Sequence, residues 1–408
     1  MRGQRFVSLG AVSTAAILLL AVCAAQAAAP MVSNVRAAQR SGTQVVDITY
    51  DLADADSSAL KVSVAISTNG GAAWFSPGAS VSGAVGMGIA PGSGKSVAWN
   101  ARVDLPAKLF SNVRVSITAS DDAAPGGMAL IPAGSFVMGN CMDPGEGWSE
   151  ELPLHTVNVS GFYMDKYDVT KALWDSVYQW GTSHGYGFEG GAEGKAANHP
   201  AHTMTWYEAV KWCNARSQQD GLAPCYYTDG GLTAVYMTGQ VAPYVNWAAG
   251  GYRLPTEAEW EKAARGGASG QRFPWGNTIS QSQANYYSYW RSGASYYPYD
   301  VNPTEGYHPT FAVGSSPYTS PVGYFGANGY GLYDMAGNVW QWCWDWYGSY
   351  GSASQTDPRG PSTGSGRVLR GGSWGGSAIG CRAAYRCGCD PTYRYYGIGF
   401  RCARAAGQ

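Results

Sequence analysis

The sequence predicts a small all-β unit followed by a larger, irregular α+β domain. Three observations lead to this prediction. The first part of the chain holds short segments of alternating apolar and polar residues, the second holds long loops rich in Gly, Tyr and Ser, and two helical patterns stand out in the second part. A chain of 408 residues with a hydrophobic fraction of 45% is long and apolar enough for two to three packed domains.

Residues 1–29 are predicted to be a secretory signal peptide. Arg2 and Arg5 precede an apolar stretch from about Val12 to Cys23, and small residues follow up to Ala29, which is the order of such signals. The apolar stretch is shorter than the roughly 20 residues that a membrane-spanning helix needs, and no other segment is apolar enough to span a bilayer. We therefore expect a secreted, periplasmic or cell-surface protein without a membrane span.

The composition favours recognition of a protein or glycan over nucleic-acid binding. The 27 basic and 28 acidic residues give a formal net charge of −1, and no basic run is present, whereas nucleic-acid-binding domains usually carry a basic patch. Charged residues make up 13% of the chain, and 28 Tyr, 16 Trp and 56 Gly residues take their place. Tyr and Gly are favoured on recognition surfaces, so the expected partner is a protein or glycan outside the cell.

Residues 30–122 are predicted to form a β-sandwich of immunoglobulin or fibronectin type that serves as a spacer. The segments 45–50, 60–66, 97–100 and 113–117 alternate in the manner of strands, and a turn signal, Asn-Gly-Gly, follows the second of them. We find no catalytic combination of residues in this unit. A short segment rich in Asp, Ala, Pro and Gly, from residue 121 onward, is the predicted linker.

Residues 127–405 are predicted to form the α+β domain. Thr205 is a predicted N-cap with Glu208 as its reciprocal partner, before a helix over residues 206–214. A second helix is predicted over residues 257–265, after Thr256 and before Gly266. Its acidic residues lie in the first turn and its basic residues lie late, as the helix dipole prefers.

Several motifs of this domain occur in the order that is typical of one family. They are IPAGSFVMG at 131–139, FYMDKYDVT at 162–170, YRLPTEAEWE at 252–261, NGYGLYDMAGNVW at 328–340, RGGSW at 370–374 and GFR at 399–401. With these motifs, nearly all of residues 127–405 resembles the formylglycine-generating enzyme, or sulfatase-modifying-factor, family. The resemblance implies an irregular C-type-lectin-like fold.

The resemblance implies an activity that this sequence does not fully support. Enzymes of the family oxidise a substrate cysteine to formylglycine with copper held by two cysteines, and the matching positions are Gly376 and Cys381. One thiolate is a poor site for Cu(I), so we expect neither bound copper nor oxidase activity. The alternative is a cysteine oxidase or a nonheme-iron enzyme, with Cys381 as the catalytic candidate. The related iron enzymes, however, use three histidines and a helical partner domain, and the extra domain here is β-rich.

The resemblance also implies a structural Ca²⁺ site. Oxygen ligands from a tight Gly-containing turn suit this ion. The predicted ligands are Asp334, Gly337, Val339 and Gln341, with Asn285 in a second site. Gln341 stands where the family has Glu, which removes a negative charge and weakens the site.

One disulfide, between Cys213 and Cys402, is implied by the resemblance. In an oxidising compartment disulfides are the expected state of cysteines. Pairing remains open for the other cysteines after residue 29, which are Cys141, Cys225, Cys343, Cys381, Cys387 and Cys389.

Residues 375–397 resemble the variable region of proteins that are diversified by retroelements, several of which have a C-type-lectin-like fold. The segment is rich in Tyr, Gly and Cys and contains no Lys, Glu, Gln, Trp or Met, which are the residues that adenine mutagenesis of Asn codons ending in C cannot produce. Tyr provides a large, stiff contact, and Arg382, Arg386 and Arg394 interleave with the tyrosines as further candidate hot spots.

We therefore predict a ligand-binding protein, catalytically inactive, whose C-terminal face is exposed on one side of the domain. For the segment, the alternative is a loop that fills space around the fold. For the protein, a further alternative is a structural protein associated with carbohydrate or a cell wall. The predicted ligand contacts are Trp374, Gly375, Gly376, Ser377, Gly380, Tyr385, Cys387, Cys389, Asp390, Tyr393, Tyr395 and Tyr396.

Overall fold

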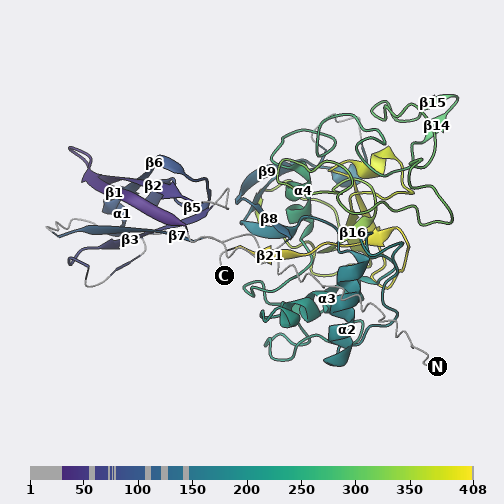
Figure 1. Cartoon of the computed structure of the whole chain (residues 1–408), viewed down its shortest axis with the longest axis horizontal. Helices are drawn as coiled ribbons and strands as arrows, with labels where there is room; N and C mark the ends of the chain where they lie inside the picture. The colour runs from purple at the N-terminus through teal and green to yellow at the C-terminus, as the bar shows by residue number, and fades with distance from the viewer. Residues whose placement is uncertain are drawn as a thin grey trace, which may run out of the picture. The chain divides into compact units, whose positions relative to one another are not determined.

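The computed structural model describes residues 30–54, 60–71, 74–75, 77, 80–105, 112–120, 127–140 and 147–406. The predicted signal peptide, Cys141 and nearly all of the predicted linker lie outside these residues. The chain forms two compact units that divide near residue 121 (Figure 1). No helix in the described ranges combines the length and the apolar character that a membrane crossing requires.

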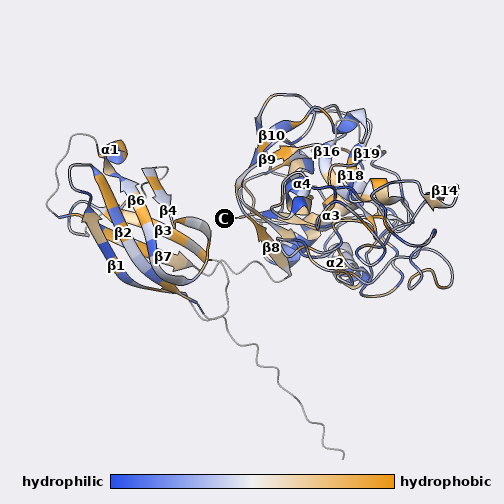
Figure 2. Ribbon diagram, turned by 90° about the horizontal axis from the view of Figure 1, so that it is seen from above, coloured by the Kyte–Doolittle hydropathy of each residue, from blue (hydrophilic) through white to orange (hydrophobic). Residues whose placement is uncertain are grey.

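The N-terminal unit consists of two sheets, with strand orders β1-β2-β6-β4 and β5-β3-β7. Alternate residues of β2 and β6 face the core, as Ile48, Tyr50 and Leu52 of β2 and Val97 and Trp99 of β6 show. Apolar and polar bands alternate along these strands in Figure 2. The N-terminal region is all-β, as predicted, apart from one short helix. Its elements are β1 (Met31–Gln39), β2 (Val45–Ala53), β3 (Leu60–Ser67), β4 (Val81–Gly83), β5 (Gly86–Ile89), β6 (Gly92–Asn100), α1 (Ala101–Asp104) and β7 (Arg114–Ser120).

Three α-helices occur in the described part of the second unit: α2 (Lys171–Ser183), α3 (Trp206–Gln219) and α4 (Glu257–Arg265). The helices α3 and α4 begin after the expected residues, Thr205 and Thr256, and each has a reciprocal capping box with the glutamate three residues on. The sequence analysis missed α2, which begins after Thr170 and lies beside α3 (Figure 1).

Short strands make up the rest of the regular structure of this unit. A four-stranded sheet of order β19-β18-β16-β20 carries the C-terminal segment. One core packs Trp206 and Trp212 of α3 against Trp342 and Phe400, and another surrounds Trp260 of α4. Few helices, many short strands and long loops confirm the predicted α+β class. The strands are β8 (Met128–Ile131), β9 (Gly134–Met138), β10 (His155–Val159), β11 (Phe162–Asp165), β12 (Tyr226–Tyr227), β13 (Tyr244–Val245), β14 (Trp290–Arg291), β15 (Ala294–Ser295), β16 (Trp340–Trp346), β17 (Gln355–Thr356), β18 (Arg367–Arg370), β19 (Arg386–Cys389), β20 (Ile398–Gly399) and β21 (Ala403–Ala405).

Candidate functional site

A glycine turn at the end of β18 starts the candidate site. Gly371 and Gly372 have φ values of +94° and +76°, which favour glycine. A Cβ at Gly372 would lie 2.9 Å from the carbonyl carbon of Gly380 and 3.0 Å from Sγ of Cys381. The turn therefore packs directly against Gly380 and Cys381. It also fixes the position of Trp374, whose backbone N–H donates to the carbonyl of Asn338 at 2.9 Å.

The middle of the segment 375–397 is buried and forms part of the scaffold of the domain. Arg382 makes a two-point ion pair with Glu151, at 2.8 and 2.6 Å, and Arg386 makes one with Glu257, at 2.7 and 2.6 Å. All four side chains are at most 5% exposed. The expectation that these two arginines are ligand hot spots is therefore wrong, because the glutamates already occupy both guanidinium groups.

Both ends of the segment carry aromatic rings that contact one another. Tyr393 stacks on Tyr395 with ring centroids 6.2 Å apart, Tyr395 meets Tyr396 at 4.3 Å, and Tyr396 stacks on Trp374 at 5.5 Å. Tyr393 and Tyr396 are 50% and 39% exposed, whereas Trp374 is only 4% exposed. The rings thus form a row whose base is buried and whose outer members face solvent.

Three tyrosines from a distant loop extend this row, and sequence reasoning did not single them out. Tyr307 and Tyr318 contact Trp374 with ring centroids 5.6 and 5.3 Å away, and Tyr287 contacts Tyr307 at 4.8 Å. We call these seven rings the tyrosine face: Tyr287, Tyr307, Tyr318, Trp374, Tyr393, Tyr395 and Tyr396. The backbone N–H of Tyr287 donates to the carbonyl of Gly376 at 2.9 Å, so the predicted contacts Gly375, Gly376 and Ser377 lie beside this face.

The backbone under the tyrosine face is held by an ion pair. Arg394 binds Glu208 at 2.7 Å and donates to the carbonyl oxygens of Gly191 and Thr203. Burial favours the neutral form of Glu208, but hydrogen bonds from Arg394 and from backbone N–H groups outweigh it and lower the pKa of this carboxyl. Arg394 is thus a positioning residue, and its charge is neutralised.

The remaining predicted contacts lie in two other places. Tyr385, Cys387, Cys389 and Asp390 line a separate hollow of about 490 Å³ together with Trp148. Gly380 is buried, so its prediction as a ligand contact is corrected, and Cys381, the catalytic candidate, is buried beside it. The segment is therefore exposed at its C-terminal end and around Gly375, and is buried in its middle.

The surroundings of Cys381 do not fit a copper centre. The thiol is fully buried among apolar and aromatic residues that include Phe273, Ile279 and Ala378. Burial, followed by the Asp300 carboxylate, raises the pKa of Cys381, which disfavours the thiolate that Cu(I) requires. In the described ranges no group of three or more His, Cys, Asp or Glu side chains has metal-binding geometry.

The two predicted calcium sites differ in how well they fit the ion. Gln341 Oε1 already accepts hydrogen bonds from Trp260 Nε1 at 2.7 Å and Arg401 Nε at 2.8 Å. Its Nε2 donates to the carbonyl oxygen of Asp334 at 2.9 Å. The segment from Asp334 through Gly337 and Val339 to Gln341 thus holds a guanidinium where a cation was expected and does not fit calcium. Asn285 Oδ1 is buried without a hydrogen-bond partner among the described residues, and it fits a cation.

Cys213 and Cys402 face each other in the core. Their sulfur atoms are 3.7 Å apart and both residues are fully buried, whereas a disulfide has a sulfur–sulfur bond of about 2.05 Å. The structure places the two thiols side by side, and the disulfide stays a prediction.

Comparison with known proteins now adds to this geometry. The family model of the sulfatase-modifying factor enzyme 1-like domain matches residues 116–406. The formylglycine-generating enzyme of Mus musculus is 33% identical over 296 residues, covering 68% of this chain and 74% of the relative. That of Streptomyces coelicolor is 32% identical over 295 residues, covering 69% and 90%. The solved structure of Treponema denticola variable protein 1 matches with a TM-score of 0.52 and 31% identity, covering 68% of this chain and 94% of that one.

This chain belongs to the formylglycine-generating-enzyme (sulfatase-modifying factor) family. The predicted recognition of the family and of its fold is thereby confirmed, and so is the likeness to a variable protein. The fold accommodates both enzymes and variable proteins, so the function has to be argued from the site.

Proposed function

We propose that this chain is an exported binding protein whose family domain presents the tyrosine face to a protein or glycan ligand and does not oxidise cysteines. The observation that carries the proposal is the row of seven mutually contacting rings, of which Tyr307, Tyr393 and Tyr396 are 39–50% exposed. Exposed aromatic rings on a fixed backbone give large contacts at a small cost in conformational entropy.

The charges around the face support a ligand without strong net charge. Arg394 is paired with Glu208, and the ammonium of Lys195 lies over the Tyr318 ring and donates to the carbonyl oxygens of Phe311 and Val313. Each of these cations is therefore engaged within the domain. The likeness to the variable protein supports a role in recognition.

The glycine at position 376, where the family has its first copper-binding cysteine, supports the loss of oxidase activity. Gly376 offers no ligand and Cys381 is enclosed by apolar side chains. We expect no formylglycine when a cysteine-containing peptide is incubated with the protein, Cu(I) and oxygen under conditions in which the mouse relative converts it. Conversion at a comparable rate would refute this part of the proposal.

Replacing three tyrosines tests the binding proposal. The triple variant Tyr393→Ala, Tyr395→Ala, Tyr396→Ala removes one end of the face, and because two of the rings are exposed it should lower the free energy of unfolding by no more than roughly 2 kcal/mol. Wild type and variant are probed on a glycan array and on an array of extracellular protein domains. We expect ligands of the wild type to lose at least tenfold in affinity for the triple variant.

A matched control uses exposed tyrosines elsewhere in the domain. Tyr244 and Tyr324 are 56% and 54% exposed and lie outside the tyrosine face, so their double replacement by Ala should leave binding unchanged. Ligands that bind the triple variant as well as the wild type would rule out the face as the binding site. A drop in stability of several kcal/mol per ring would instead identify the segment as space-filling structure.

A further inference from the structure

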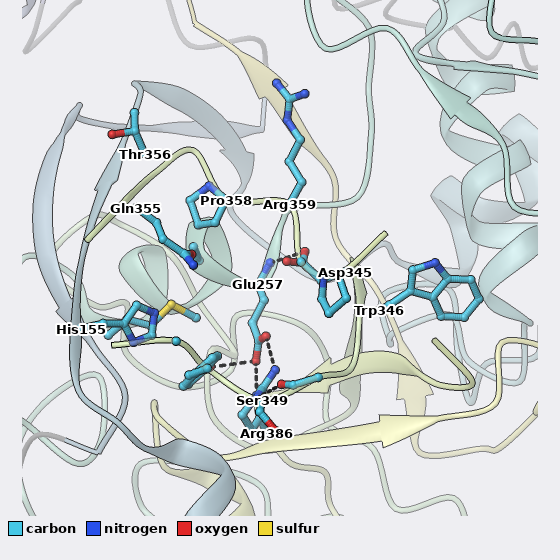
Figure 3. Close-up of a pocket in the computed structure, with 17 residues that line it drawn as sticks. His155, Glu257, Asp345, Trp346, Ser349, Gln355, Thr356, Pro358, Arg359 and Arg386 are labelled. Atoms are coloured by element: carbon cyan, nitrogen blue, oxygen red, sulfur yellow. Dashed lines mark hydrogen bonds and ion pairs between the residues drawn. The ribbon is translucent and has the colours of Figure 1, made fainter. Parts of the chain in front are cut away.

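A second hollow of the family domain shares no residue with the tyrosine face. Its volume is about 540 Å³, within the range of roughly 300–1,000 Å³ that is typical of small-molecule sites. Its walls come from the end of β9, β10, the first turn of α4, the end of β16 with the loop after it, β17 with the turn after it, and β19 (Figure 3). No motif of the sequence pointed to it, because these segments are far apart in the chain.

Asp345 is the one buried acidic side chain of this cavity without a cationic partner among the described residues. It is 4% exposed, and its Oδ2 accepts the backbone N–H of Glu257 at 2.8 Å. No described residue donates a hydrogen bond to its Oδ1, and no described Lys, Arg or His lies at ion-pair distance. Glu257, in contrast, is paired with Arg386 through both oxygens and accepts the hydroxyl of Tyr350 at 3.1 Å.

The electrostatic surroundings make this carboxyl receptive to a positive charge. Burial, followed by the charge of Glu257, raises the pKa of Asp345 to about 8. A cation that binds the carboxyl directly favours its charged form and offsets part of the cost of ionising it in a buried place. Arg359 does not fill this role, because its guanidinium lies 4.3 Å over the Trp247 ring and extends away from Asp345 (Figure 3).

The other walls carry groups that suit hydroxyls and a carbon skeleton. Ser349 and Gln355 supply a hydroxyl and an amide group, and the ring of Tyr350 supplies apolar wall. Gln355 directs its amide toward Glu257 and Asp345, whereas the side chain of Thr356 points the other way (Figure 3).

We propose that this cavity binds a small hydroxylated molecule that carries a protonated amine, such as an amino sugar, with its ammonium group on Oδ1 of Asp345. An anionic ligand would face the carboxyl group of Asp345, and the Arg386 guanidinium on the same wall is already paired with Glu257. A neutral sugar brings no positive charge, so it would leave the ionised form of Asp345 as unfavourable as in the empty cavity. Binding of an ammonium satisfies the carboxyl and leaves the hydroxyl and amide groups for the rest of the ligand.

Calorimetric titration of the full chain at neutral pH tests the proposal with three matched probes: glucosamine, glucose and glucuronate. We expect glucosamine to bind at least tenfold tighter than the other two, and Asp345→Asn, which keeps the acceptor for Glu257, to abolish this preference. Equal binding of glucosamine and glucose, tighter binding of glucuronate, or no binding of glucosamine would each overturn the proposal.

A second pair of variants guards against a fold defect in Asp345→Asn. Gln355→Lys places an ammonium group inside the cavity and should weaken glucosamine binding at least tenfold. Thr356→Lys adds the same charge one residue later on the opposite face of β17 and should leave the affinity within twofold. If both lysine variants bind glucosamine like the wild type, or if both lose binding equally, the ligand does not lie against Asp345 and the proposal fails.

Discussion

The middle and the C-terminal end of the same 23-residue segment, 375–397, differ in what their side chains contact. In the middle, Arg382 and Arg386 reach buried glutamates from distant parts of the chain. At the end, Tyr393, Tyr395 and Tyr396 contact mainly one another and Trp374. This difference shows that a run of interleaved Arg and Tyr is not by itself a binding surface. An arginine that pairs with a buried glutamate stabilises the fold and is not available to a ligand.

The largest expected effect comes from breaking a charge pair of the middle. Arg382→Met leaves the buried carboxylate of Glu151 without its cationic partner. Loss of one partner of a buried ion pair lowers the free energy of unfolding by about 3–5 kcal/mol. Denaturant unfolding of this variant should show that loss. The double variant with Glu151→Gln should recover most of it. A single variant as stable as the wild type would remove the distinction between scaffold and face.

The base and the rim of the tyrosine face should differ in the same experiment. Trp374 is 4% exposed, so Trp374→Ala should lower the free energy of unfolding by about 3–5 kcal/mol, as for other buried aromatic residues. Tyr393 is 50% exposed, and Tyr393→Ala should change the free energy of unfolding by about 0.5 kcal/mol or less. Equal effects would show that the row of rings is a single packed unit without a free outer edge.

Calcium binding tests the support of the tyrosine face, because Asn285 lies behind that face. Asn285 accepts from the backbone of Asn338, which in turn accepts from Trp374, at 2.8 and 2.9 Å. An ion that binds only the folded state stabilises it by mass action, so we expect excess Ca²⁺ to raise the melting temperature relative to EDTA by a few degrees, and Asn285→Ala to abolish the rise. Asp334→Asn should retain it. The opposite pattern would place the ion in the segment that ends at Gln341.

The smallest change in stability is expected at Gly376. A Cβ there would meet its nearest neighbour at 3.5 Å, an ordinary contact, so Gly376→Cys should change the free energy of unfolding by less than about 0.5 kcal/mol. The variant restores the family's pair of thiols, and copper analysis should show whether Cys381 can then leave its apolar surroundings. A stoichiometric gain of Cu(I) would show that the burial of Cys381 is conditional, and an unchanged copper content would show that it is fixed.

Local signals in the sequence were sufficient for α3 and α4, since a threonine and a glutamate three residues apart fix a helix start. The same logic missed α2, which has no acidic residue in its first turn. The family motifs predicted the C-type-lectin-like domain because they are specific and occur in order. The partners of Arg382 and Arg386 were not predictable, since ion pairs between residues so far apart depend on the finished fold.

The same limit explains what was missed at the sites. Tyr393, Tyr395 and Tyr396 were found because they are neighbours in sequence, but Tyr287, Tyr307 and Tyr318 join them only through the path of a long loop. The cavity around Asp345 was missed altogether, because its chemistry depends on one carboxyl that no described cation pairs while its neighbour Glu257 is paired.

The ring-on-ring contacts of the tyrosine face have a consequence for how such a protein can change over generations. When an outer ring is lost, the members of the row that it touched remain attached to a backbone held by Arg394 and Glu208. A population can therefore exchange side chains at Tyr393 and Tyr396 one at a time and keep a folded product at every step. Under the proposed binding function, tolerance of this kind lets new specificities arise by drift before any ligand selects them.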